Sequence, residues 1–140
     1  MRIFLDANFL ISVLNKEYPS FTYTSRILSL ADKKKFILFT SPVCLAIAFY
    51  FAEKKYKAVS AKKRIQILYE HINIAPTTRN TVLQSLKNPA VNDFEDGLEY
   101  YSAVENKCDC IITEDIDDFH FSDIEVLNSE DFFEKYLFTS

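Results

Sequence analysis

Short apolar runs alternate with segments of helical periodicity along the chain, and this alternation most constrains the fold. Residues 1–5 form a short apolar run that stops at Asp6. Residues 110–113 form another, which stops at Glu114. Runs of this length and character are typical of buried parallel strands. Because strands alternate with helices throughout, the sequence predicts an α/β fold with a parallel sheet covered by helices on both faces.

The other elements follow from apolar periodicity and from the capping and proline signals that bound each segment. Strands are predicted over residues 36–40, 72–75, 108–113 and 124–127. Helices are predicted over residues 9–15 (capped by Asn8), 22–34, 43–52, 58–71, from Thr77 or Thr78 to Asn88, 94–106, and from residues 129–132 onward. The run 43–52 is too continuously apolar for a surface helix, so this helix is predicted to be buried.

Composition limits the number of domains and excludes some classes of function. The 140 residues fit one domain of ordinary size, so we expect a single domain over residues 1–140. A hydrophobic content of 49% favours a compact globule over a disordered chain. The only glycine is Gly97, which excludes a P-loop and a Gly-x-Gly-x-x-Gly dinucleotide turn.

Charge and cysteine usage bear on partners and location. A net charge of −4 gives no overall attraction to nucleic acid, so RNA binding would depend on local basic patches and a metal ion. The basic stretches 33–35, 54–57 and 62–64 are interpreted as solvated helix ends, with guidance of an RNA backbone as the alternative. The three cysteines are interpreted as packing residues. No apolar run reaches the ~20 residues of a membrane span, so we expect a reducing, cytoplasmic setting without a membrane partner.

Carboxylates stand where predicted strands end. Asp6 and Asp115 follow two of the predicted strands, and Asp93 and Asp96 open the helix that leads into the strand 108–113. In open α/β sheets the functional crevice lies beyond the carboxyl ends of the strands, where such groups converge. Several unpaired carboxylates at close range repel one another, so either their pKa values rise or a hard cation joins them. The spacing therefore predicts a metal site.

Two of these acids have a second interpretation. Asp6 could cap the helix that follows it, although its match with Asp96 and Asp115 favours metal binding. Asp93 lies three residues before Asp96, on the same helix face, so it is either a further ligand or an N-terminal cap.

Four pieces of the chain, in order, resemble the PIN domain family. They are Asp6-Ala-Asn8, the run 93–103 (DFEDGLEYYSA), the strand and loop 112–119 (ITEDIDDF), and the tail 124–132 (IEVLNSEDF). The resemblance extends over nearly the whole chain. It implies a three-layer α/β/α fold and a Mg²⁺- or Mn²⁺-dependent endoribonuclease, most often a VapC-like toxin that pairs with an antitoxin and forms a homodimer.

Carried over residue by residue, the resemblance implies acidic ligands at Asp6, Asp96 and Asp115. Asn8 and Thr113 take the positions of polar supporting residues. Asp118 matches another acidic position of the family and is either a support for the ligands or a solvated loop residue.

One acid of the family is absent. The family has a Glu early in the helix after the second strand, and Ile47 stands at that position. A site of this kind works with fewer ligands, recruits a substitute such as Asp93, or has lost catalysis. The prediction is a metal-dependent endoribonuclease that hydrolyses RNA phosphodiesters. The alternatives are a catalytically impaired PIN domain that binds RNA or protein and, ranked last, a phosphoryl-accepting receiver-like domain, for which no strand end supplies the usual Lys.

Overall fold

The computed structural model describes residues 1–33 and 35–138, and within them five strands form one parallel sheet. The order across the sheet is β3-β2-β1-β4-β5, and every neighbouring pair is parallel. The strands are β1 (Arg2–Leu5), β2 (Ile37–Thr40), β3 (Asn73–Ile74), β4 (Cys110–Ile112) and β5 (Glu125–Leu127). The predicted parallel sheet is confirmed.

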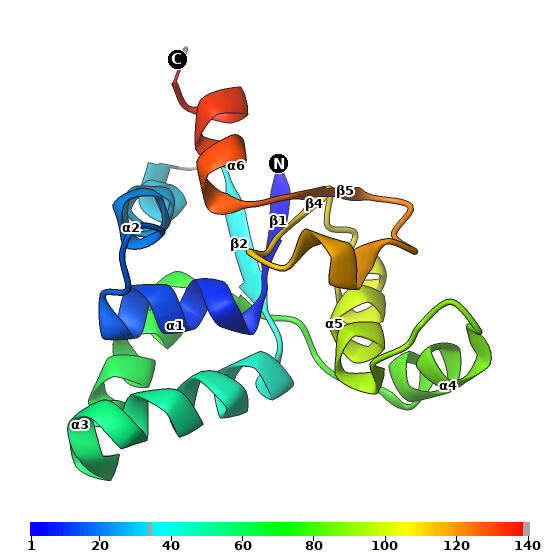
Figure 1. Cartoon of the computed structure of the whole chain (residues 1–140), viewed down its shortest axis with the longest axis horizontal. Coiled ribbons are helices and arrows are strands. Elements are labelled where there is room, and N and C mark those ends of the chain that lie inside the picture. Colours follow the sequence, from blue (N-terminus) through cyan, green and yellow to red (C-terminus); the bar gives the residue numbers. More distant parts are fainter. Residues whose placement is uncertain (34, 139–140) are drawn as a thin grey trace.

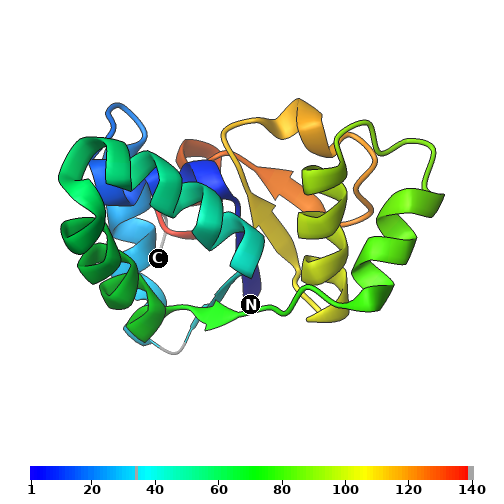
Figure 2. The ribbon, with the colours of Figure 1, turned by 90° about the horizontal axis from the view of Figure 1, so that it is seen from below.

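Helices cover both faces of this sheet (Figures 1 and 2). The helices are α1 (Ala7–Asn15), α2 (Phe21–Ser29), α3 (Pro42–His71), α4 (Arg79–Lys87), α5 (Phe94–Glu105) and α6 (Ser129–Tyr136), with the 3₁₀ turns η1 (Leu30–Lys33) and η2 (Ile116–Phe119). In Figure 1, α1, α2 and α3 lie on one side, and α4 and α5 lie on the other. The three-layer α/β/α architecture expected from the family resemblance is therefore confirmed.

The direction in which successive strands are added to the sheet reverses between β1 and β4. From β1 it builds outward through β2 to β3, and it then returns to build β4 and β5 on the other side of β1. Such a switch point opens a crevice at the carboxyl ends of the two strands, because the connecting helices leave on opposite faces. Asp6 follows β1 directly and Thr113 follows β4, so both residues lie at this crevice.

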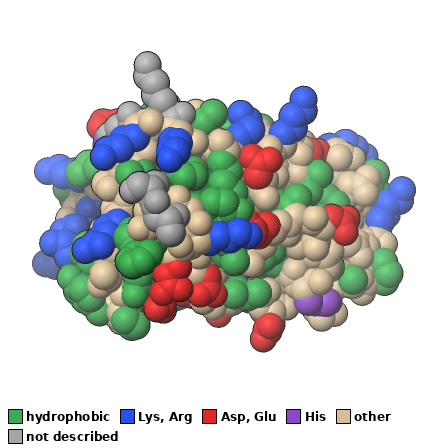
Figure 3. Space-filling model, turned by 90° about the horizontal axis from the view of Figure 1, so that it is seen from above, with side chains coloured by type: hydrophobic (Ala, Val, Ile, Leu, Met, Phe, Trp, Pro, Cys, Tyr) green, Lys and Arg blue, Asp and Glu red, His purple; other side chains and the backbone are tan. Residues whose placement is uncertain are grey.

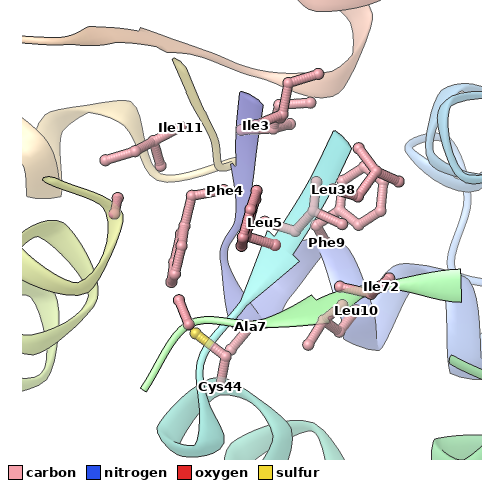
Figure 4. Packing of buried hydrophobic residues seen from close by; sticks show 14 of the residues in the cluster. Ile3, Phe4, Leu5, Ala7, Phe9, Leu10, Leu38, Cys44, Ile72 and Ile111 are labelled. Atoms are coloured by element: carbon pink, nitrogen blue, oxygen red, sulfur yellow. The ribbon is translucent and has the colours of Figure 1, made fainter. Parts of the chain in front are cut away.

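The centre of the sheet forms the hydrophobic core. Ile3, Phe4 and Leu5 of β1 are fully buried, as are Ile111 and Ile112 of β4. Figure 4 shows Phe4 on the side of α5, whereas Leu38 and Phe9 lie on the side of α1. Burial of each such side chain contributes roughly 1.5–3 kcal/mol, so the two strands that end at the crevice are firmly fixed.

The predicted cap of the first helix was wrong. Asn8 does not cap the first helix, since α1 begins at Ala7 and Asp6 is its N-cap. The backbone leaves β1 and enters the helix without an intervening turn, and the Asp6 carboxylate therefore meets the first helical N–H. The helix predicted over residues 22–34 is α2 followed by η1, and its predicted end at Lys34 lies outside the described residues.

Helix α3 combines the two helices predicted over residues 43–52 and 58–71. Lys57 interrupts it with a φ of 67°, and the chain folds back there (Figure 1). The first half is not wholly buried as predicted, since Tyr50 is 54% exposed and Phe51 is 43% exposed. Small residues of one stripe, such as Ala48, pack inward, and the continuous apolar run leaves its larger side chains on the open face. None of the helices in the described part of the chain is long and apolar enough to span a bilayer.

Candidate metal centre

Acidic side chains from separate parts of the chain line one cavity of about 220 Å³ at the switch point. Its lining residues are Asp6, Ala7, Asn8, Ile11, Ile47, Asp93, Glu95, Asp96, Glu99, Asp115 and Asp118. The structure thus brings together every acid that the sequence singled out for the site. Among the residues that the structure describes, neither Lys nor Arg lines the cavity, so the cavity concentrates negative charge.

Asp6 lies at the end of the central strand and is only 7% exposed. Its Oδ1 accepts a hydrogen bond of 2.6 Å from the backbone N–H of Ala7, and its Oδ2 accepts one of 2.7 Å from the hydroxyl of Thr113. The two interpretations of Asp6 are therefore compatible. One residue caps α1 and also presents a fixed carboxylate at the cavity wall.

Asn8 and Thr113 connect the loop after β1 to the loop after β4. The Asn8 amide donates to Thr113 Oγ1 and to Asp115 Oδ2, each at 3.1 Å. The side-chain Oδ1 of Asn8 accepts from the Glu114 N–H at 3.2 Å, and the Asp115 N–H donates to Thr113 Oγ1 at 3.0 Å. These bonds fix the Asp115 carboxylate at the crevice where Asp6 lies, although the two residues are 109 positions apart in the sequence.

The first turn of α5 brings two further acids to the cavity. Asp93 is the N-cap and accepts a hydrogen bond of 2.9 Å from the Glu95 N–H, and it also lines the cavity. Asp96 follows one turn later. Burial, together with the negative charges of Asp93 and Asp118, raises the pKa of Asp96 from 3.8 to about 7. A cation in the cavity would reverse this effect, because an opposite charge favours the ionised carboxylate.

Asp118 belongs to η2 and faces the same cavity. Partial burial and the nearby charge of Asp115 raise the pKa of the Asp118 carboxyl group. A residue of a purely solvated loop would not experience these neighbours. The geometry thus favours the interpretation of Asp118 as part of the acidic site.

Glu99 was not identified from the sequence, yet it is the most deeply buried acid of the cavity, with 2% exposure. The thiol of Cys44, from α3, donates a hydrogen bond of 2.6 Å to Glu99 Oε1. Ligand atoms of Asp6, Cys44 and Glu99 lie within 4.8 Å of one another. Burial and the neighbouring Asp6 raise the pKa of Glu99 well above its ordinary value. Its spacing of three residues after Asp96 was the available sequence signal, since such residues share a helix face.

The donors around the cavity suit a hard divalent cation. They are predominantly carboxylate oxygens, which Mg²⁺ and Mn²⁺ prefer, and no His lines the cavity within residues 1–33 and 35–138. Burial and Glu99 raise the pKa of the Cys44 thiol, which keeps it a hydrogen-bond donor and not a thiolate ligand. The residues present therefore fit Mg²⁺ or Mn²⁺ better than Zn²⁺.

The sequence profile of the PIN domain matches residues 2–117. The chain belongs to the PIN domain family. It is 26% identical over 138 residues to "Ribonuclease VapC1" of Aquifex aeolicus (strain VF5), with 96% of this chain and 95% of that protein covered.

Solved structures of PIN proteins share the fold. The structure of VapBC2 from Rickettsia felis, bound to a promoter DNA fragment, superposes with a TM-score of 0.67 at 18% identity and covers 91% of this chain and 98% of its own. VapBC-1 from nontypeable Haemophilus influenzae gives 0.67 at 18% identity, covering 93% and 99%. VapC20 of Mycobacterium tuberculosis, named as a toxin that cleaves the sarcin-ricin loop, gives 0.62 at 15% identity, covering 78% and 86%.

Proposed function

We propose that this chain, as a single domain over residues 1–140, is a metal-dependent endoribonuclease that acts as the cytoplasmic toxin of a toxin–antitoxin pair. The observation that carries the proposal is the convergence of Asp6, Asp96 and Asp115 on one cavity, which no Lys or Arg of the described part of the chain lines. The PIN family assignment and the names of the ribonuclease and toxin relatives support the same reaction class.

Asp6, Asp96 and Asp115 would hold one or two Mg²⁺ or Mn²⁺ ions, with Asp93 and Asp118 as further acids of the site. When bound, the ion supplies Lewis acidity that neutralises the charge gathering on the phosphodiester. The chain's own residues position the ligands. Thr113 and the N-terminus of α1 hold the two oxygens of Asp6, so this carboxylate is preorganised to bind the cation.

The metal would also supply most of the local attraction for RNA. Acidic and basic side chains appear in separate small groups on the face in Figure 3, and neither forms a continuous field. Part of the predicted basic surface is engaged within the protein. Lys55 Nζ donates to the Asn15 carbonyl at 2.5 Å, and the Arg64 guanidinium lies 3.6 Å from the Tyr56 ring centre. RNA binding is therefore expected to weaken sharply when the metal is removed.

An antitoxin protein is the proposed partner, and a homodimer is the proposed assembly. Two of the structural neighbours are VapBC proteins, and the exposed side chains Tyr50, Phe51, Ile67 and Tyr69 of α3 offer apolar area for an interface. Light scattering on the purified chain measures the assembly. A mass of 16.3 kDa at micromolar concentration would contradict the homodimer.

The test of the reaction is cleavage of several structured and single-stranded RNAs with Mg²⁺, with Mn²⁺ and with EDTA. Cleavage should require the metal, and Asp6→Asn should abolish it while the circular dichroism spectrum stays unchanged. Asp123→Asn is the matched control, because Asp123 is exposed and does not line the cavity. Cleavage that persists in EDTA or in Asp6→Asn would refute the mechanism.

A PIN domain that binds RNA or protein without cutting is the second candidate. The observation that favours it is Ile47, an apolar residue on the wall of the acidic cavity. Calorimetry separates the two candidates. An absence of Mg²⁺ and Mn²⁺ binding, with RNA binding retained, would favour the second.

A further inference from the structure

We propose that Glu99 of α5 is the fourth carboxylate of this metal site and takes the role that Ile47 cannot fill from α3. The inference rests on the proposed function, since it assumes that the cavity holds a divalent cation. Neither the sequence motifs nor the family resemblance assigns this ligand role to Glu99.

Glu99 lies on α5 and lines the cavity beside the other acids. Glu99 follows Asp96 by one helical turn, so both side chains leave the same face of α5 toward the cavity. One Glu99 oxygen lies within 4.8 Å of an Asp6 oxygen, a separation that allows both to contact one ion. Ile47 lines the same cavity from α3, so the two helices face a common space.

Helix α3 contributes a positioning group in place of a carboxylate. Cys44 lies three residues before Ile47, and its thiol holds Glu99 Oε1 at 2.6 Å. Cys44 is itself fixed, because its N–H donates to the Ser41 hydroxyl that caps α3, and it is fully buried. The side chain of Glu99 is thereby anchored at one oxygen and directed into the site.

The Glu99 carboxyl group is almost completely buried. No Lys or Arg of the described residues lines the cavity, so a carboxylate with 2% exposure costs free energy there unless a cation or a proton neutralises it. If Glu99 had a purely structural role, Gln would serve equally well in its place. Gln has the same shape and accepts the same hydrogen bond from Cys44. A ligand role, by contrast, requires the carboxylate at position 99.

The experiment is Mn²⁺ calorimetry on the full chain, with thermal unfolding of each variant with and without Mn²⁺. Glu99→Gln should bind Mn²⁺ roughly ten- to a hundredfold more weakly than the wild type, and its metal-free midpoint of unfolding should be equal or higher. Glu105→Gln is the control, because Glu105 lies on the same helix, contacts Thr78 and Asn80, and does not line the cavity. It should leave the affinity unchanged.

The double variant Ile47→Glu, Glu99→Gln tests whether the two positions are equivalent. It should recover most of the affinity lost in Glu99→Gln, because the carboxylate enters the same cavity from α3. A wild-type chain that does not bind Mn²⁺ would refute the proposed function and this inference with it. Wild-type binding that Glu99→Gln retains in full, or a double variant that binds no better than Glu99→Gln, would overturn the role of Glu99 alone.

Discussion

The hydroxyl of Thr113 donates a hydrogen bond of 2.7 Å to Asp6 Oδ2 and thereby joins the end of β4 to the end of β1. Thr113 Oγ1 in turn accepts hydrogen bonds from the Asn8 amide and from the Asp115 N–H. One buried hydroxyl thus serves three groups of the acidic site, and its removal would leave all three short of a partner.

Thr113→Val tests this arrangement, because valine keeps the shape and lacks the hydroxyl. We expect the free energy of unfolding to fall by about 1–3 kcal/mol, since buried polar groups lose their partner. Mn²⁺ affinity should fall as well, because Asp6 and Asp115 are no longer oriented. Urea denaturation and calorimetry measure the two effects. Thr113→Ser keeps the hydroxyl and should retain most of the affinity; equal losses in both variants would contradict the role of the bond.

The stability of the metal-free protein should depend on pH through Asp96. Its pKa is about 7 in the folded state against an ordinary value of 3.8, so the folded state binds more protons between these pH values. The free energy of unfolding should therefore fall as the pH rises from about 4 to about 7. After allowance for solvent screening of this partly exposed group, the fall is about 1–2 kcal/mol.

Urea denaturation at pH 5 and pH 7.5 in EDTA measures this dependence. Asp96→Asn should flatten it in part, because Glu99 and Asp118 are shifted in the same direction. An unchanged slope in Asp96→Asn would show that Asp96 is not the group responsible. Saturating Mn²⁺ at pH 7.5 should restore the lost stability, because it binds only the folded site.

Gly97→Ala should destabilise the chain although alanine favours helices. A Cβ at position 97 would lie 2.8 Å from Ser85 Oγ and 2.9 Å from Ser85 Cβ on α4, and 2.8 Å from Val91 Cγ1. Overpacking of this kind costs roughly 1–3 kcal/mol, which exceeds the helix-propensity gain of about 1 kcal/mol. Val104→Ala, on the exposed face of the same helix, is the control for thermal denaturation. A raised midpoint in Gly97→Ala would contradict the close packing.

The three cysteines should be unreactive in the native protein. Cys44, Cys108 and Cys110 are all buried, and burial raises the pKa of Cys108 and of Cys110 to about 12. The thiolate is the reactive form, so a disulfide reagent at pH 8 should modify none of them until urea unfolds the chain. Three thiols should then react. Rapid labelling of the native protein would place at least one cysteine outside the core.

The sequence by itself determined the order of the strands and helices, the parallel sheet and the acids at its edge. These features are local, because alternation, apolar period, capping residues and prolines each act within a few neighbouring positions. Asp6, Asp96 and Asp115 could be selected in this way, since each stands at a strand end or on the helix that leads into a strand.

Only the tertiary structure decided which side chains meet. Cys44 and Glu99 are 55 positions apart, and their contact exists because α3 and α5 approach the crevice from opposite faces of the sheet. The open face of α3 was likewise invisible in the sequence, since an apolar run does not reveal which of its sides another helix covers. Contacts across the sheet depend on the strand order and on the reversal between β1 and β4, and no local period of the sequence encodes either one.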